Sequence, residues 1–225
     1  MQNRKINIFL ILALCVTLVL GLVGCQNVNR ALEESVSEIH ETVLNGSDDD
    51  FFVEAIGGKM EAEYALDGVK NPSREFVSIR VRETGDENVD TFSAVFTLEN
   101  NDYDLSLKRS PVDSSVWTVY IESSLPVETL DLTLVYGEDS RNFQLKKVVA
   151  GEVKPLDILK TNFENELMQC YENGKFNCEI SVRLVRSPKK QDEKYFWHVV
   201  VYKPDKTFFG LMIDASTGEV LSKKS

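Results

Sequence analysis

The sequence predicts a mainly β protein. We expect an antiparallel β-sandwich, preceded by a short helix and followed by a small α+β domain of one helix and a three-stranded antiparallel sheet. Three observations lead to this fold class. Apolar residues alternate with polar ones over residues 58–149, recur with a helical period over residues 155–170, and alternate again from residue 178. Clusters of turn-forming residues separate these segments.

Composition places the chain among ordinary globular proteins. It has 225 residues, of which 43% are hydrophobic and 27% charged, and its net charge is −11. These values exclude long disorder, collagen and a membrane protein with many spans. Because a phosphate backbone requires an excess of basic residues, the acidic balance also argues against nucleic acid as a partner. We expect a monomer.

The amino terminus carries the most specific signal. Arg4 and Lys5 precede an almost continuous apolar run at residues 8–23, which is the pattern of an export signal. Leu22-Val23-Gly24-Cys25 follows and resembles the lipobox of bacterial lipoprotein signal peptides. The alternative is a plain membrane anchor with an incidental cysteine.

The lipobox resemblance has two implications for the mature protein. The Cys25 sulfur would be lipidated, and residues 1–24 would be removed as a signal peptide. The rest of the chain would then lie on the extracytoplasmic face of the cell membrane, where two or more acyl chains anchor stably. Membrane lipid is thus an expected partner through Cys25.

Residues 25–57 are predicted to form a tether and a short helix. Apolar residues at i, i+4, i+7 and i+11 indicate an amphipathic helix that ends at Asn45-Gly46; they are Leu32, Val36, Ile39 and Val43. Residues 51–56 are expected to form a short helical turn or an irregular lead-in.

Residues 58–149 contain seven candidate strands joined by turn residues. The number and close spacing of the strands favour a β-sandwich. This pattern is similar to that of bacterial immunoglobulin-like domains, although the Cys–Trp–Cys signature of antibody-type domains is absent. The alternating sets are centred on residues 60–66, 77–81, 92–98, 103–107, 117–121, 130–134 and 143–149.

Residues 150–225 begin with a linker and continue with one helix and three strands. The helix has one apolar stripe, and the strands cover residues 178–184, 195–202 and 207–215. With the closing run Asp214-Ala215-Ser216-Thr217-Gly218-Glu219-Val220, this segment resembles the PepSY family of small exported domains. The resemblance implies a fold and a loose class, since such domains occur in inhibitory protease propeptides and in envelope proteins. In the closing turn we expect Asp214 to accept backbone N–H groups and Gly218 to have positive φ.

Two cysteines remain after the signal and the lipidation site. Cys170 lies on the helical stripe and Cys178 on the apolar face of the next strand. They form either a disulfide or a pair of buried thiols.

No residue pattern indicates catalysis, a cofactor or a metal. His40 is expected at the surface or boundary of the first helix, and His198 as a packed or partly exposed residue of its strand. Asp86-Glu87-Asn88-Val89-Asp90 starts like a calcium loop but lacks the glycine and the final glutamate that such a loop needs. We predict no catalytic, cofactor-binding or metal-binding residues.

The strand at residues 195–202 is apolar on both faces. Either the remainder of the protein covers its second face, or an aromatic surface is left for a partner protein. The candidate partner-binding residues are Tyr195, Phe196, Trp197 and Tyr202.

The features together favour a non-enzymatic binding or regulatory role at the cell envelope, such as control of an envelope protease or of assembly. The expected partner is an envelope protein. The alternatives are a surface lipoprotein that captures a small ligand and, third, an envelope enzyme.

Overall fold

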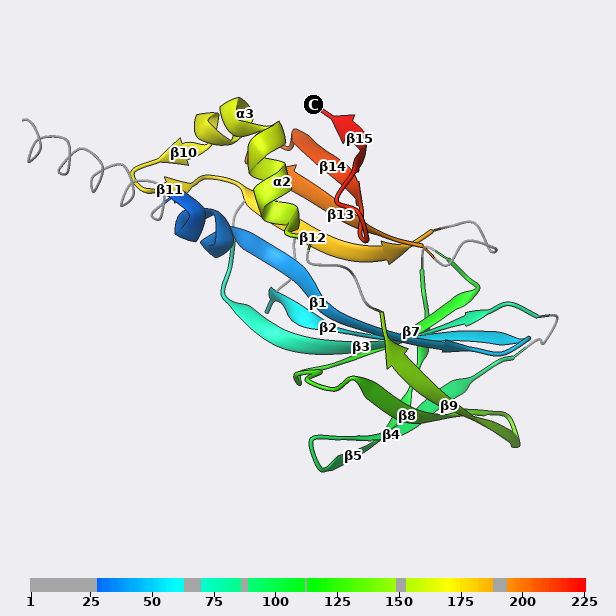
Figure 1. Ribbon diagram of the computed structural model, residues 1–225. Coiled ribbons are helices and arrows are strands. Elements are labelled where there is room, and N and C mark those ends of the chain that lie inside the picture. The colour runs from blue at the N-terminus through cyan, green and yellow to red at the C-terminus, as the bar shows by residue number, and fades with distance from the viewer. Residues whose placement is uncertain (1–27, 63–69, 86–88, 112, 149–152, 188–193) are drawn as a thin grey trace, which may run out of the picture.

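The computed structural model describes residues 28–62, 70–85, 89–111, 113–148, 153–187 and 194–225. It confirms a mainly antiparallel β protein (Figure 1). Thirteen strands form one continuous sheet, and β10 and β11 form a separate hairpin. The sheet strands are β1 (Val36–Ser47), β2 (Phe51–Glu61), β3 (Ser73–Glu83), β4 (Phe92–Leu98), β5 (Asn101–Ser106), β6 (Lys108–Arg109), β7 (Val116–Ile121), β8 (Thr129–Tyr136), β9 (Asp139–Lys147), β12 (Glu179–Arg186), β13 (Tyr195–Tyr202), β14 (Phe208–Asp214) and β15 (Val220–Lys224).

The helices and the hairpin are short. Residues 28–34 are helical, α2 spans Pro155–Asn162 and α3 spans Glu164–Gln169. The hairpin strands β10 (Tyr171–Glu172) and β11 (Lys175–Phe176) follow α3 directly. Figure 1 shows α2 and α3 lying over β12, β13 and β14.

Strand β1 joins the two parts of the sheet. One of its edges pairs along nearly its whole length with β2. The other edge pairs first with β12, in parallel, over residues 36–39, and then with β9, antiparallel, at Leu44 and Asn45. The order β15-β14-β13-β12-β1-β2-β3-β7-β6 therefore branches at β1 into β9, β8, β4 and β5.

A β-bulge in β1 lies between the residues that pair with β12 and those that pair with β9. The register with β2 shifts between His40 and Thr42, and such a bulge bends and twists its strand. Two glycines of β2 lie opposite this point. A Cβ added at Gly58 would overlap the Ile39 carbonyl oxygen, and one at Gly57 would overlap the Leu125 side chain. The absence of side chains at Gly57 and Gly58 thus lets β2 lie close to the Leu125 side chain and to the Ile39 backbone.

The core between β1–β3, β7 and the branch β9, β8 and β4 is rich in aromatic rings. Phe92 lies 5.5 Å from Phe51 and 5.2 Å from Trp117 between ring centroids, and Phe51 lies 5.0 Å from Tyr136. Each pair has the edge-to-face geometry that aromatic quadrupoles favour. In β8, the fully buried Leu134 and its alternate neighbours point into this core.

A second core lies between the helices and β12–β14. The stripe predicted for the helix is buried there, with Leu159, Phe163 and Leu167 almost inaccessible to solvent. The stripe is divided between two helices, however, because Phe163 has φ −136° and ends α2. The strand expected at residues 178–184 and those at 195–202 and 207–215 correspond to β12, β13 and β14.

The helix predicted over residues 32–43 is wrong. Helical structure ends by Ser35, and Val36 starts the twelve-residue strand β1. β-Branched residues such as Val36, Ile39 and Val43 favour strands, and pairing on both edges outweighs the helical spacing. Residues 51–56 likewise form the first half of β2 rather than a turn or lead-in. The boundary expected at residue 58 consequently falls inside β2.

Replacing Gly58 with alanine tests the close approach at the bulge. The Cβ would overlap backbone, which cannot rotate away, so we expect Gly58→Ala to lower the free energy of unfolding by about 3 kcal/mol. Urea unfolding followed by circular dichroism measures the change. Loss of less than about 0.5 kcal/mol would show that β1 and β2 are not held this closely.

Candidate functional site

The two faces of β13 have different surroundings. Tyr195 and Trp197 are each 8% exposed and belong to the core under α2 and α3. Phe196, His198 and Tyr202 alternate with them and remain partly exposed on the opposite face. Of the predicted partner-binding residues, Phe196 and Tyr202 are thus available at the surface, whereas Tyr195 and Trp197 are core residues.

The neighbouring strand extends this exposed face. Tyr202 is directly paired with Phe208, and His198 with Met212, so these side chains share one face. Phe208 is 42% exposed, and its ring lies 6.0 Å from that of Tyr202. We call this face the outer strip; its partly or fully exposed residues are Phe196, His198, Tyr202, Phe208 and Met212, and the buried Val200 lies between His198 and Tyr202.

Tyr195 instead anchors the start of β13 to β1 and β2. Its hydroxyl oxygen accepts a hydrogen bond from Asn45 Nδ2 at 2.7 Å and lies 3.3 Å from Glu54 Oε1. Burial raises the pKa of Tyr195 and also that of Glu54. This contact fixes which face of β13 points inward.

A buried polar cluster joins β1 to β12. His40 Nε2 lies 2.9 Å from one carboxylate oxygen of Glu38. Arg183 donates to the other oxygen from Nε at 2.7 Å and from Nη2 at 2.6 Å, and Ser181 Oγ lies 3.3 Å from it. His40 is only 7% exposed, so the surface or boundary position expected from the sequence is wrong.

The charged and hydrogen-bonding neighbours in this cluster determine the protonation state of Glu38. Burial by itself raises the pKa of this carboxyl, but the hydrogen bond with His40 and the positive charge of Arg183 outweigh burial and lower the pKa to about 2. The carboxylate is therefore ionised at neutral pH and holds two strands together. Its atoms are all engaged within the protein, which suits a structural role.

His198 is a partly exposed member of the outer strip. Burial, with the nearby charge of Arg183, lowers its pKa. It is thus a neutral, half-buried ring between Phe196 and Tyr202 on the same face of β13.

The two cysteines of the helix-covered core are free thiols in the structure. Cys170 Sγ donates a hydrogen bond to the Glu166 carbonyl oxygen at 3.5 Å. Burial raises the pKa of both thiols, that of Cys178 to about 12. Because the thiolate is the nucleophile and metal ligand, a raised pKa disfavours both roles at neutral pH.

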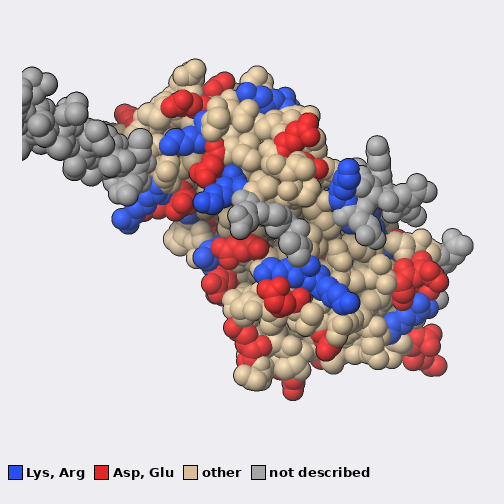
Figure 2. Space-filling model, viewed as in Figure 1, with Lys and Arg blue, Asp and Glu red and all other residues tan. Residues whose placement is uncertain are grey.

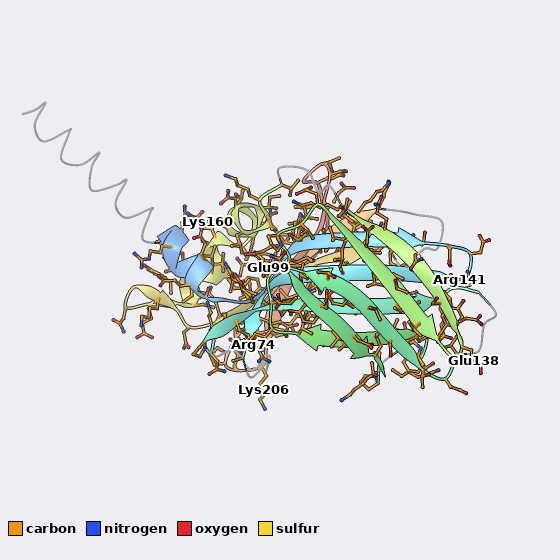
Figure 3. The ribbon with its side chains drawn as sticks, turned by 90° about the horizontal axis from the view of Figure 1, so that it is seen from below. Arg74, Glu99, Glu138, Arg141, Lys160 and Lys206 are labelled. Atoms are coloured by element: carbon orange, nitrogen blue, oxygen red, sulfur yellow. The ribbon has the colours of Figure 1, made fainter. Side chains whose placement is uncertain are left out.

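The acidic turn between β1 and β2 is bound by a single arginine. Arg141 of β9 contacts Asp48 at 2.9 Å and Asp50 at 2.7 Å. Figure 3 shows Arg141 beside Glu138 at the end of the β8–β9 hairpin. Figure 2 shows acidic and basic side chains interspersed on the visible face. Asp48 and Asp50 thus close a turn of the fold.

A groove of about 680 Å³ lies on the face of β4, β5, β8 and β9. Its polar side chains pair with one another: Thr97 with Asp102 at 2.7 Å and Thr133 with Asn142 at 2.7 Å. Within the described part of the chain, no group of three or more His, Cys, Asp or Glu side chains could hold a metal ion. Residues 86–88 of the calcium-like run lie outside the described residues.

The predicted signal peptide and Cys25 also lie outside the described residues. Among the residues that are described, no helix has the length and hydrophobicity to cross a membrane.

Comparison of the chain with protein-family models, curated proteins and solved structures gives no match. The sequence predicted the aromatic character of β13, but not which residues face outward or that β14 contributes Phe208 and Met212.

The cluster around Glu38 makes the folding stability of the protein depend on pH. Because folding lowers the pKa of Glu38 from 4.5 to about 2, its contribution is full above about pH 4.5 and is lost as the pH falls through about 2. Glu38→Gln should remove this dependence and destabilise the protein by about 3 kcal/mol, since Arg183 is left partly buried without its partner.

Urea unfolding between pH 2 and 7 measures both effects. Glu41→Gln is the matched control, because Glu41 is an exposed neighbour that contacts Lys59 at 3.4 Å on the surface; its effect should stay below about 1 kcal/mol. Equal effects of the two substitutions would contradict a special role for Glu38.

Proposed function

We propose that this protein is a lipid-anchored, extracytoplasmic binding protein of the cell envelope, held to the membrane through Cys25. It acts by non-enzymatic contact with an envelope protein, in control of a protease or of assembly. The observation that carries the binding role is the outer strip, an aromatic sheet face opposite the helix-covered core.

The chemistry of the outer strip supports protein binding. Aromatic rings bring large contact area with little loss of side-chain freedom, and they are enriched at the centres of interfaces. Phe208 also lies under Lys224, whose Nζ is 4.1 Å from the ring centroid. A partner surface with an apolar centre and an acidic rim would suit this combination of rings and a cation.

The finer assignment of the fold belongs to the same proposal. We propose that residues 155–225 form a PepSY-like unit and residues 58–149 an immunoglobulin-like sandwich. The antiparallel order β12-β13-β14 after the helices supports the first assignment. In its closing turn, Asp214 Oδ1 accepts the backbone N–H groups of Ser216 at 2.9 Å and Thr217 at 3.0 Å, and Gly218 has φ +76°. This geometry makes the turn a structural feature and not a catalytic one.

Small-ligand capture is the second candidate. The groove over β4, β5, β8 and β9 favours it through its size and through the polar side chains in its mixed lining. A ligand there would replace the existing contacts between Thr133 and Asn142, so it would have to offer both donors and acceptors.

Removal of Cys25 tests the anchor. We expect Cys25→Ala to move the protein from the membrane fraction to the soluble fraction or to leave the signal uncut, because no acyl chain can be attached. Cys15→Ala is the matched control, since that cysteine lies within the signal and should leave localisation unchanged. Mass spectrometry of the processed amino terminus reads the modification directly. An unmodified Cys25 would contradict the lipid anchor.

A charge on the outer strip tests partner binding. We expect Phe208→Glu to reduce crosslinking to an envelope protein in intact cells by on the order of tenfold, because it replaces an aromatic contact with a charge that must be desolvated in the interface. Its melting temperature should stay unchanged, since Phe208 is a surface residue.

Tyr120→Glu is the control for general surface effects. Tyr120 is an aromatic residue of β7 that is 56% exposed and lies outside the outer strip. It should leave the crosslink intact. Equal loss in both variants, or no loss in Phe208→Glu, would contradict the assignment of the outer strip.

A further inference from the structure

An apolar groove lies beside the first described residues of the chain. Helix 28–34, α2, α3 and the β10–β11 hairpin surround it, and its volume is about 160 Å³. Figure 1 shows these elements gathered at one end of the molecule. Leu32 and Leu167 are buried at its base, while Val28 and Phe176 are half-buried at its sides.

The groove leaves apolar surface in water. Met168 is 46% exposed, although it is one of the large apolar residues that line the groove. The Phe176 ring is supported from the other side by Tyr171, with 4.8 Å between the centroids. Methionine is flexible and polarizable, so it adapts to irregular apolar ligands. The lining therefore suits a hydrocarbon.

Two charged residues, Lys160 and Glu164, also line the groove. Lys160 of α2 donates a hydrogen bond to Asn29 Oδ1 at 2.7 Å and so links α2 to helix 28–34. Figure 3 shows Lys160 next to that helix. The other five lining residues are apolar.

We propose that one acyl chain of the lipid on Cys25 lies in this groove. The inference rests on the lipid anchor of the proposed function. Cys25 precedes Val28, which lines the groove, by three residues, and three residues span at most about 11 Å. The chain connection thus holds an acyl chain at the groove entrance at high effective concentration.

The size of the groove determines how much of the chain it holds. A volume of 160 Å³ accommodates roughly five water-sized groups, and a methylene group is of similar size. One segment of an acyl chain therefore fits, and the remainder lies outside the groove. The other acyl chains of the lipid remain in the bilayer, so the anchor is retained. The groove holds the helix layer close to the membrane surface.

Photocrosslinking of the full-length protein in cells tests this proposal. Cells are fed a palmitate analogue with a diazirine on the chain and are irradiated, and peptides are identified by mass spectrometry. We expect a crosslink between the lipid on Cys25 and the segment at residues 164–176. Met168→Glu should reduce this crosslink by on the order of tenfold, because a charge disfavours hydrocarbon in the groove.

Leu221→Glu provides a matched control. Leu221 of β15 is also 46% exposed and does not line the groove, so the crosslink should persist. A labelled Cys25 that crosslinks only to phospholipid or to another protein would overturn the groove while leaving the lipid anchor intact. A Cys25 without label would overturn both, which distinguishes the two failures.

Discussion

Hydrogen bonding along one edge of β1 holds the whole sheet together. The first half of that edge pairs with β12 and the second half with β9, so one strand belongs to both parts of the protein. The Ile180 N–H donates to the Ser35 carbonyl at 3.0 Å, and the Val148 N–H donates to that of Val43 at 2.7 Å. Glu38 and Arg183 strengthen the first junction with an ion pair in which Glu38 is buried and Arg183 is partly exposed.

This arrangement positions both proposed surfaces. The core under α2 and α3 occupies one face of β12–β14, and the outer strip occupies the other. The apolar groove belongs to the helix layer, near the point where the chain would leave the membrane. In the proposed function, lipid contact and protein contact therefore use opposite sides of the same small sheet.

Local patterns predicted much of this fold. Alternating residues in β4 and β8 face opposite sides of their strands, and burial on one side gives them a period of two. The helical stripe of Leu159, Phe163 and Leu167 could also be predicted from the sequence, because all three side chains pack on a single core. The turn at Asp214 could be predicted as well, because its hydrogen bonds join residues that are close in the sequence.

Long-range pairing could not be predicted in the same way. Val36, Ile39 and Val43 have helical spacing. They form a strand because β1 pairs with β2 and with β12, where Val36 lies opposite Ile180, 144 positions further along the chain. The Glu38 cluster depends on the same pairing, since His40 and Arg183 meet only across β1 and β12. The division of β13 into buried Tyr195 and Trp197 and exposed Phe196 and Tyr202 depends on which layer covers it.

Native-state amide hydrogen exchange tests the central role of β1 most directly. If β1 unites the sheet, the most protected amides of β12 and β13 should open with the same free energy as those of β8 and β9, because one cooperative unit contains them all. The amides of Ile180 and Val148 report the two junctions. Opening of β12–β15 at a free energy several kcal/mol lower, with β8 and β9 still protected, would contradict this account and show two independent units.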